Sequence, residues 1–348
     1  MKHTHLHTRL LALLLCCALV LPLSACGEAK STTQQIFAMD TVMDLTAYGK
    51  KADDGINAAI SIINSMDTLL DPENERSKTY EINHAMGSPV VVNEQIAKML
   101  RTALTVYERT NGAFDLTTYP LSKLWGFIDQ NYRVPSDAEI ERLLPCVDMS
   151  KVQLAATDDS ANSLVTMPAD MALSFGAVAK GCASEYAIQA MRAAGVTSGV
   201  VSLGGNVQTL GKKPDGSDWN IAIQDPNDTG SYLGYLTVGE TAVITSGSYQ
   251  RYFTEGGQKY HHILSPTTGR PVNNGLLAVT IVCEDGTLAD CLSTAMFVLG
   301  PQAALNYWRT YGGFEMLLVK TDGHVVLTNG LYGQFTPNGD SYVVDYAS

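Results

Sequence analysis

The chain has few cysteines, and none of them is spaced as in a metal site. Seven occur in 348 residues, with no CxxC pair. Cys16 and Cys17 lie in an N-terminal apolar run, and Cys26 directly follows that run. The other four stand in apolar surroundings: Cys146, Cys182, Cys283 and Cys291. We expect these four to be small buried side chains rather than a zinc site or a disulfide framework.

The chain is also poor in positive charge and lacks the common nucleotide-binding loops. Lys and Arg number 23 against 35 Asp and Glu, which gives a net charge of −12. This acidic balance argues against a nucleic-acid partner. Neither GxxxxGK(S/T) nor GxGxxG occurs, which excludes a Walker loop and a Rossmann turn. After the N-terminal region there is no internal repeat or low-complexity stretch, so we expect one continuous domain.

The N-terminus is typical of an export signal. Lys2 and Arg9 precede an apolar run at residues 10–23, which is too short for a comfortable membrane span. The following "LSAC" resembles the lipobox of bacterial lipoproteins. It implies that residues 1–25 are removed, that Cys26 carries lipid, and that the protein is anchored outside the cytoplasm at the cell membrane. A plain secretory signal is the alternative. The remaining chain of about 320 residues has a net charge of −14.

Residues 26–35 are predicted to be a polar tether, and residues 36–348 the domain. Helices are predicted at 53–70, 94–110, 137–144, after Gly176 up to Gly195, at 287–299 and from Pro301. Strands are predicted at 152–155, 163–167, 171–175, 200–203, 220–224, 234–238, 242–246, 277–283, 314–320 and 324–328, with a hairpin turning at Gly256-Gly257. Because the elements do not alternate regularly, an α+β fold is favoured.

Several stretches break this pattern in ways that packing alone does not require. "FDLTTYPLSKLWGF" at 114–127 is either aromatic core cover, which we favour, or a platform for a planar ring. "SFGAVAKG" at 174–181 is either a routine turn into a helix or a phosphate site with Lys180. "SLGGN" at 202–206 fits a hairpin or bulge as well as a ligand loop.

Two further stretches carry groups suited to catalysis. In "YHHILSPTTGRP" at 260–271, His261 and His262 are neighbours on a strand, so they face opposite sides and only one can serve a site. In "ADCLSTA" at 289–295, Asp290, Ser293 and Thr294 share one face of a predicted helix. Their oxygens mark either a cation site or a hydrated helix end.

Taken in order over residues 36–300, these stretches resemble the ApbE family, the lipoprotein FAD:protein FMN transferases. The family motifs MGT, FD…GPL…LWGF, DLGGIAKGYA, LGG, TSG.Y.R.F, Y.HI.DP.TG.P and AD..AT are similar to AMDTVM, FDLTTYPLSKLWGF, SFGAVAKGCA, LGGN, TSGSYQRYF, YHHILSPTTGRP and ADCLSTA. Each motif is weak alone, but a chance match of seven in one order is rare. The resemblance implies an α+β, T-fold-like flavin transferase domain.

The resemblance also implies an activity and its residues. The enzyme would cleave FAD with Mg²⁺, transfer FMN to a Thr or Ser of an exported partner protein, and release AMP. Mg²⁺ would be held by Asp290, Thr294 and the carbonyl oxygen of Ala177. His262 would be the catalytic base. FAD contacts are implied at Met39, Trp125, Gly126, Phe127, Ser174, Lys180 and Leu264.

Three positions depart from the family pattern. Ser174 and Ser265 stand where the family usually has Asp, and Asp40 stands where it usually has Gly. Two other functions remain open from the residues: an FAD pyrophosphatase that releases free FMN, and a lipid-anchored flavin- or solute-binding protein without turnover. The acceptor cannot be read from the chain, although the family suggests subunits of ion-pumping redox complexes or exported flavoprotein reductases.

Overall fold

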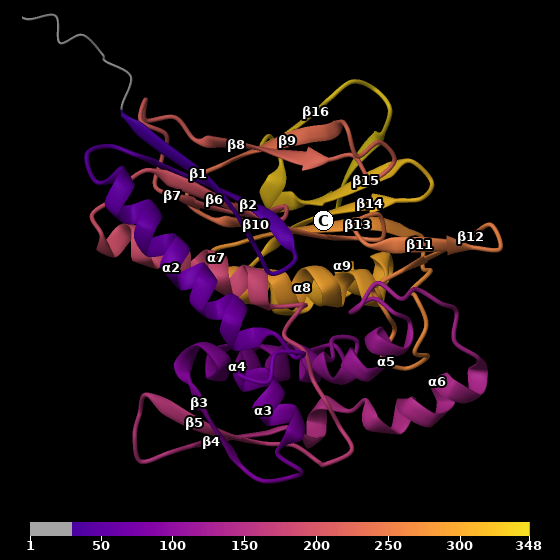
Figure 1. Ribbon diagram of the computed structural model, residues 1–348. Coiled ribbons are helices and arrows are strands. Elements are labelled where there is room, and N and C mark those ends of the chain that lie inside the picture. The colour runs from indigo at the N-terminus through magenta and orange to yellow at the C-terminus, as the bar shows by residue number, and fades with distance from the viewer. Residues whose placement is uncertain (1–29, 348) are drawn as a thin grey trace, which may run out of the picture. The chain divides into compact units, whose positions relative to one another are not determined.

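A nine-stranded sheet is the centre of the computed structural model, which describes residues 30–347 (Figure 1). Every neighbouring pair in this sheet is antiparallel except β15 and β17. The strands, in their order across the sheet, are β1 (Ser31–Ala38), β2 (Thr41–Tyr48), β6 (Gly199–Leu203), β7 (Asn206–Leu210), β10 (Ala242–Gly247), β13 (Leu276–Cys283), β14 (Glu315–Lys320), β15 (His324–Thr328) and β17 (Val343–Ala347).

The two faces of this sheet are covered differently (Figure 1). Helices cover one face: α2 (Ala52–Leu70), α7 (Ala179–Ala193), α8 (Gly286–Leu299) and α9 (Pro301–Tyr311). A three-stranded sheet covers the other: β16 (Phe335–Pro337), β9 (Tyr232–Val238) and β8 (Trp219–Gln224). Because both faces are buried, β13 and the first three residues of β10 are apolar on both sides, which explains their nearly continuous hydrophobic sequence.

A third layer lies beyond the helices (Figure 1). It contains α3 (Lys78–His84), α4 (Glu94–Arg109), α5 (Tyr119–Leu124), α6 (Asp137–Leu143) and a small sheet of β3 (Val90–Asn93), β5 (Asn162–Thr166) and β4 (Gln153–Ala156). The hairpin of β11 (Tyr252–Glu255) and β12 (Gln258–His261) packs Phe253 and Tyr260 against a separate aromatic and aliphatic cluster that includes Trp125. This hairpin brings the histidine pair toward the helical layer.

Local sequence signals fix several of these elements. The Asn93 side chain accepts a hydrogen bond from Ile96 N and caps α4. The Ser136 and Glu139 capping box begins α6 at Asp137, the first residue of the predicted helix. Gly204 and Gly205 turn the β6–β7 hairpin with positive φ angles, and Gly256 and Gly257 do the same for β11–β12. These features confirm the α+β prediction.

Other expectations differ from the structure. Residues 171–175 form no strand, because they run as an extended segment whose Ser174 N–H bonds to Leu116 on a neighbouring loop. The predicted tether at 26–35 ends earlier, since β1 begins at Ser31 and pairs with β2. The expected export signal and Cys26 lie outside the described residues. Part of the predicted 114–127 loop is helical, as α5.

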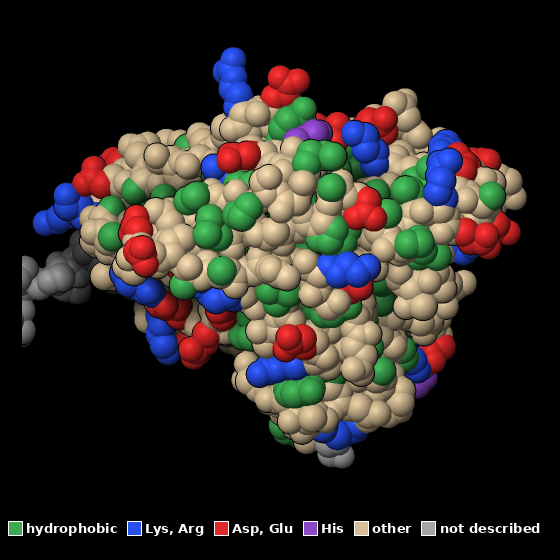
Figure 2. All heavy atoms as spheres, turned by 90° about the horizontal axis from the view of Figure 1, so that it is seen from below, with side chains coloured by type: hydrophobic (Ala, Val, Ile, Leu, Met, Phe, Trp, Pro, Cys, Tyr) green, Lys and Arg blue, Asp and Glu red, His purple; other side chains and the backbone are tan. Residues whose placement is uncertain are grey.

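The structure shows how far the four downstream cysteines are buried and how charge is distributed on the surface. Cys182, Cys283 and Cys291 are buried, as expected, whereas Cys146 is partly exposed. Acidic and basic side chains are interspersed on the face that Figure 2 shows. Among residues 30–347, no helix is both long enough and apolar enough to cross a membrane.

Helices α7 and α8 cross at a contact that only glycine permits. A Cβ on Gly181 would lie 2.1 Å from the Gly286 carbonyl oxygen and 2.5 Å from Asp290 Cβ. We therefore expect Gly181→Ala to lower the free energy of unfolding by about 1–3 kcal/mol or more, because neither backbone can move freely. Thermal melting of the purified chain measures this. Gly176→Ala is the control, since its Cβ would meet only Ser174 Oγ at 3.5 Å; an equal loss in both variants would contradict the account.

Candidate active site

Asp290 lies in the first half of α8 and points at the N-terminus of α7. It is 3% exposed. Its Oδ2 accepts a hydrogen bond of 2.8 Å from Gly181 N, and its Oδ1 accepts one of 3.0 Å from Asn206 Nδ2. Gly181 N–H is one of the amides that a helix N-terminus leaves without an intrahelical partner, so the carboxylate is held by the end of α7 as well as by Asn206.

The Ala177 carbonyl oxygen lies just before α7, which begins at Ala179. Gly181 N–H donates to Asp290, and among residues 30–347 the Ala177 carbonyl accepts no hydrogen bond. Ala177 is therefore a neutral oxygen donor beside a buried carboxylate.

One strand and one helix meet at the hydroxyls of this site. Thr294 lies one turn after Asp290 on α8, and its Oγ1 is 3.1 Å from Oγ of Ser246 on β10. Ser246 Oγ is also 2.8 Å from Ser293 Oγ. The structure thus joins Ser293 and Thr294 of "ADCLSTA" to the "TSG" stretch.

The charges around Asp290 act in opposite directions. Burial raises the pKa of the Asp290 carboxyl above its ordinary value, while the nearby Lys180 charge and the bonds from Gly181 and Asn206 oppose that rise. A cation on the carboxylate would favour its ionised form further.

The donor chemistry fits Mg²⁺ rather than a softer metal. A carboxylate, a carbonyl and a hydroxyl supply only oxygen, and they leave positions for water and substrate phosphate. In the described part of the chain no group of three or more His, Cys, Asp or Glu could hold a metal. Any ion here would therefore be held by one carboxylate and by neutral oxygens.

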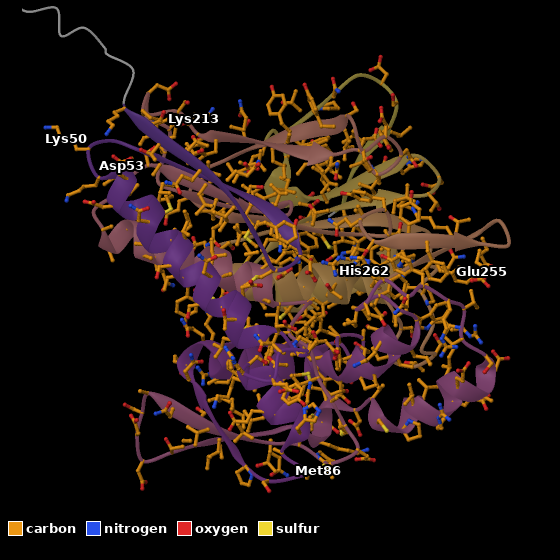
Figure 3. The ribbon with its side chains drawn as sticks, in the orientation of Figure 1. Lys50, Asp53, Met86, Lys213, Glu255 and His262 are labelled. Carbon is orange, nitrogen blue, oxygen red and sulfur yellow. The ribbon has the colours of Figure 1, made fainter. Side chains whose placement is uncertain are left out.

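His262 follows β12 and lies beside α8 at the base of the β11–β12 hairpin, whose tip carries Glu255 (Figure 3). Its Nδ1 is 3.2 Å from the Arg251 carbonyl oxygen. Because a carbonyl can only accept, Nδ1 carries the proton and Nε2 keeps its lone pair. The side chain is half-buried, and its desolvation, with the charges of Arg251 and Lys180, lowers the pKa of His262 to about 3. The side chain is therefore a neutral base at ordinary pH.

His261 faces the opposite way and has a different role. Its Nε2 donates to the Val272 carbonyl at 2.7 Å, and its Nδ1 accepts from Ile263 N at 3.3 Å. The ring is edge-on to Phe297 in the core. Both nitrogens are thus used in the fold, and only His262 is available for chemistry.

An aromatic wall stands beside His262. Phe127 lies edge-on to the imidazole, with ring centroids 6.4 Å apart. Trp125 is fully buried and donates from Nε1 to the Gly269 carbonyl at 2.8 Å, so its ring is core cover in this structure. Gly126 has φ 78°, and a Cβ there would lie 2.1 Å from Asn131 O. Leu264 is buried in the same cluster.

The β1–β2 turn approaches the site through Arg251. Met39 and Asp40 have φ of 48° and 58°, the positive angles of a tight hairpin turn. This explains the family glycine at position 40, and Asp is among the residues that tolerate such angles. The Asp40 carboxylate is 4.0 Å from the Arg251 guanidinium, and Met39 N donates to Asp67 Oδ1 at 2.8 Å.

The two serines that replace Asp keep part of its role. Ser174 Oγ accepts from Gly176 N at 3.2 Å, and Ser265 Oγ accepts from Thr268 N at 3.3 Å. A carboxylate at either position could accept the same bonds, so the turns survive while a negative charge is lost.

The predicted residues thus form two linked groups. Asp290, Thr294, Ala177 and Lys180 gather at the α7–α8 contact, and the charge of Lys180 also acts on His262. Sequence reasoning gave no role to Asn206 and Ser246, although both lie in the quoted stretches "LGGN" and "TSG". Ser246 could have been found as a polar residue near the end of β10, and Asn206 as the polar residue that follows the glycine pair.

Comparisons with known proteins identify the family of this chain. The family model described as ApbE family matches residues 39–318. The FAD:protein FMN transferase of Klebsiella pneumoniae (strain 342) is 30% identical over 285 residues, which cover 81% of this chain and 87% of that protein. The protein of that name from Treponema pallidum (strain Nichols) is 29% identical over 326 residues, covering 88% and 90%.

Solved structures give the same result. The crystal structure of the ApbE protein from Thermotoga maritima matches with a TM-score of 0.81 at 30% identity, over 88% of this chain and 99% of that one. The apo flavinyl transferase ApbE of Pseudomonas stutzeri matches with a TM-score of 0.75 at 26% identity, over 89% and 98%. The chain therefore belongs to the ApbE family.

Proposed function

We propose that the chain is an FAD:protein FMN transferase, which moves FMN from FAD to a Thr or Ser hydroxyl of a partner protein and releases AMP. One observation carries the proposal: the neutral imidazole of His262 and the oxygen donors around Asp290 lie on either side of Lys180, whose charge acts on both. The relatives named above carry this activity in their names. A protein that only binds flavin has no use for both groups.

The chain's own residues divide the reaction between them. The acceptor hydroxyl oxygen forms a bond to the phosphorus of the FMN half, and the bond from that phosphorus to the AMP oxygen breaks. Nε2 of His262 takes the hydroxyl proton, since its lone pair is free and its Nδ1–H is held by the Arg251 carbonyl. Lys180 offsets negative charge on the phosphates.

Magnesium would be held by Asp290, Thr294 and the carbonyl of Ala177, where it would supply positive charge to the pyrophosphate. Its binding site and the FAD contacts at Met39, Gly126, Phe127, Ser174 and Leu264 are part of this proposal. Because the Trp125 ring is buried, it would affect FAD binding only indirectly, by supporting the aromatic residues beside His262.

In-gel flavin fluorescence tests the function. The full chain is incubated with FAD, Mg²⁺ and a candidate acceptor, and the acceptor band should become fluorescent after denaturation. A second function, FAD hydrolysis, needs the same groups with water in place of the hydroxyl. Free FMN together with an unlabelled acceptor would favour hydrolysis and reject transfer.

We also propose that the protein works at the cell membrane, outside the cytoplasm, through lipid on Cys26. The sequence "LSAC" supports this, and an exported acceptor would meet the enzyme there. Cys26→Ser should abolish lipid attachment. The variant should then leave the membrane fraction or keep its signal uncleaved. Cell fractionation and mass measurement of the N-terminus check this; a wild-type protein with a cleaved but unmodified N-terminus, and a variant that stays in the membrane fraction, would reject the proposal.

A further inference from the structure

Three hydroxyls form a chain between β10 and α8. Thr294 Oγ1 and Ser246 Oγ are 3.1 Å apart, and Ser246 Oγ and Ser293 Oγ are 2.8 Å apart. Ser293 Oγ then donates to the backbone carbonyl of Asp290 at 2.9 Å. Ser246 and Ser293 are both buried, so these bonds are not exchanged freely for water.

The direction of every proton in this chain follows from its last bond. The Asp290 carbonyl can only accept, so Ser293 spends its single proton there. Ser293 must then accept from Ser246, and Ser246 has no second proton to give. The bond between Ser246 and Thr294 therefore has Thr294 as its donor.

We propose that Ser246 is a positioning residue that makes Thr294 a cation ligand. With its proton bound to Ser246, Thr294 Oγ1 has both lone pairs available as acceptors. A hydroxyl that ligates a metal must present a lone pair and direct its proton elsewhere. The relay Thr294 to Ser246 to Ser293 supplies that direction before the ion arrives, so no reorientation is needed on binding.

The inference rests on the proposed function, because it concerns the cation of the same site. Groups that orient metal ligands typically change metal affinity by about 10- to 100-fold. The relay consists of uncharged hydroxyls, so its effect on metal affinity should be at the lower end of that range. Ser246→Ala should therefore weaken cation binding about tenfold. Ser293→Ala should have the same effect, since Ser246 could then turn its proton toward Thr294.

Mn²⁺ alone is the probe, added to the full chain and followed by the electron paramagnetic resonance signal of the free ion. This readout needs neither FAD nor turnover. Ser246→Ala and Ser293→Ala should each weaken Mn²⁺ binding about tenfold, and the double variant should be no weaker than either, because both break one relay. Ser246→Thr, which keeps the hydroxyl, should return to within about threefold.

Two controls give each outcome a meaning. Thr245→Ala removes a hydroxyl from the same strand. That hydroxyl bonds to Thr280 Oγ1 at 2.8 Å on the neighbouring strand β13, so the variant should bind Mn²⁺ as wild type does. Asp290→Asn should lose Mn²⁺ binding. Suppose that Asp290→Asn loses Mn²⁺ binding. If Ser246→Ala then binds Mn²⁺ within about twofold of wild type, or if the double variant binds about a hundredfold more weakly, the relay is wrong but the cation site stands. Unchanged binding in Asp290→Asn would reject both. Melting temperatures, with Ser246→Thr as the rescue, separate a folding defect from a binding defect.

Discussion

Asp290→Asn is expected to lower the rate of AMP release from FAD about a thousandfold without weakening the fold. The amide keeps the size of the side chain but loses the charge that would hold Mg²⁺, and metal assistance is worth several kcal/mol of barrier. Steady-state AMP release at saturating FAD measures the loss.

Whereas Asp290→Asn should lower activity, it should not lower stability. Burial raises the pKa of Asp290, so the folded state holds its proton to higher pH than the unfolded state, whose carboxyl titrates near 3.8. The free energy of unfolding therefore falls as pH rises through that window, and at neutral pH the charge is a net cost. Asp290→Asn removes this cost, and its amide oxygen can accept from Gly181 N while its NH2 donates to Asn206 once that amide is reversed. The variant should then melt at or above the wild-type temperature at pH 7.

Asp285→Asn is the matched control for this variant. Asp285 caps α8 by accepting from Leu288 N at 2.9 Å, and asparagine caps a helix equally well. It should keep AMP release within about twofold of wild type. Undiminished AMP release in Asp290→Asn, or equal losses in both variants, would contradict the cation site.

His262→Gln is expected to lower FMN transfer about 100- to 10,000-fold while FAD still binds. Glutamine keeps a polar side chain of similar length, but it offers no basic lone pair. Single-turnover labelling of the acceptor measures transfer, and fluorescence titration measures FAD binding. His261→Gln is the control, since His261 bonds only within the fold and its loss should lower stability more than transfer.

The pH profile gives this prediction a second test. With its pKa lowered to about 3, His262 is neutral throughout the range from pH 5 to 8. The kcat/KM of wild type should therefore show no inflection near 6.5, the ordinary value for His. A rate that falls tenfold per pH unit below 6.5, and loses this fall in His262→Gln, would contradict a base that is neutral across this range.

The same shift affects folding. The unfolded state binds a proton on His262 below about 6.5, whereas the folded state does so only near 3. The free energy of unfolding therefore rises with pH across that window. His262→Gln should make this acid limb less steep in thermal melts recorded between pH 4 and 7.

The sequence was most informative where a local pattern sets the geometry. Asp290 and Thr294 are four apart, and that spacing alone puts them on one face of α8. The opposite directions of His261 and His262 followed in the same way from strand alternation. The starts of the helices predicted at 94–110 and 137–144 were equally local, since the capping bonds of Asn93 and Ser136 each span three residues.

Contacts between distant segments were beyond that kind of reasoning. Asn206 is 84 residues from Asp290, and Ser246 is 47 from Ser293, so no periodicity joins them. The missed β1–β2 hairpin turns at Met39-Asp40, which has no glycine, and the missed β17 forms the sheet's parallel pair. The strand expected at 171–175 has a suitable composition but no partner strand.

The stoichiometry of a single reaction tests the central claim most directly. The full chain is mixed with FAD, Mg²⁺ and a candidate acceptor; covalent FMN on the acceptor is counted by intact-protein mass spectrometry and AMP by chromatography. The account predicts one bound FMN for each AMP, with the FMN on a Thr or Ser and no accumulation of free FMN. AMP released with free FMN, and none on the acceptor, would contradict it.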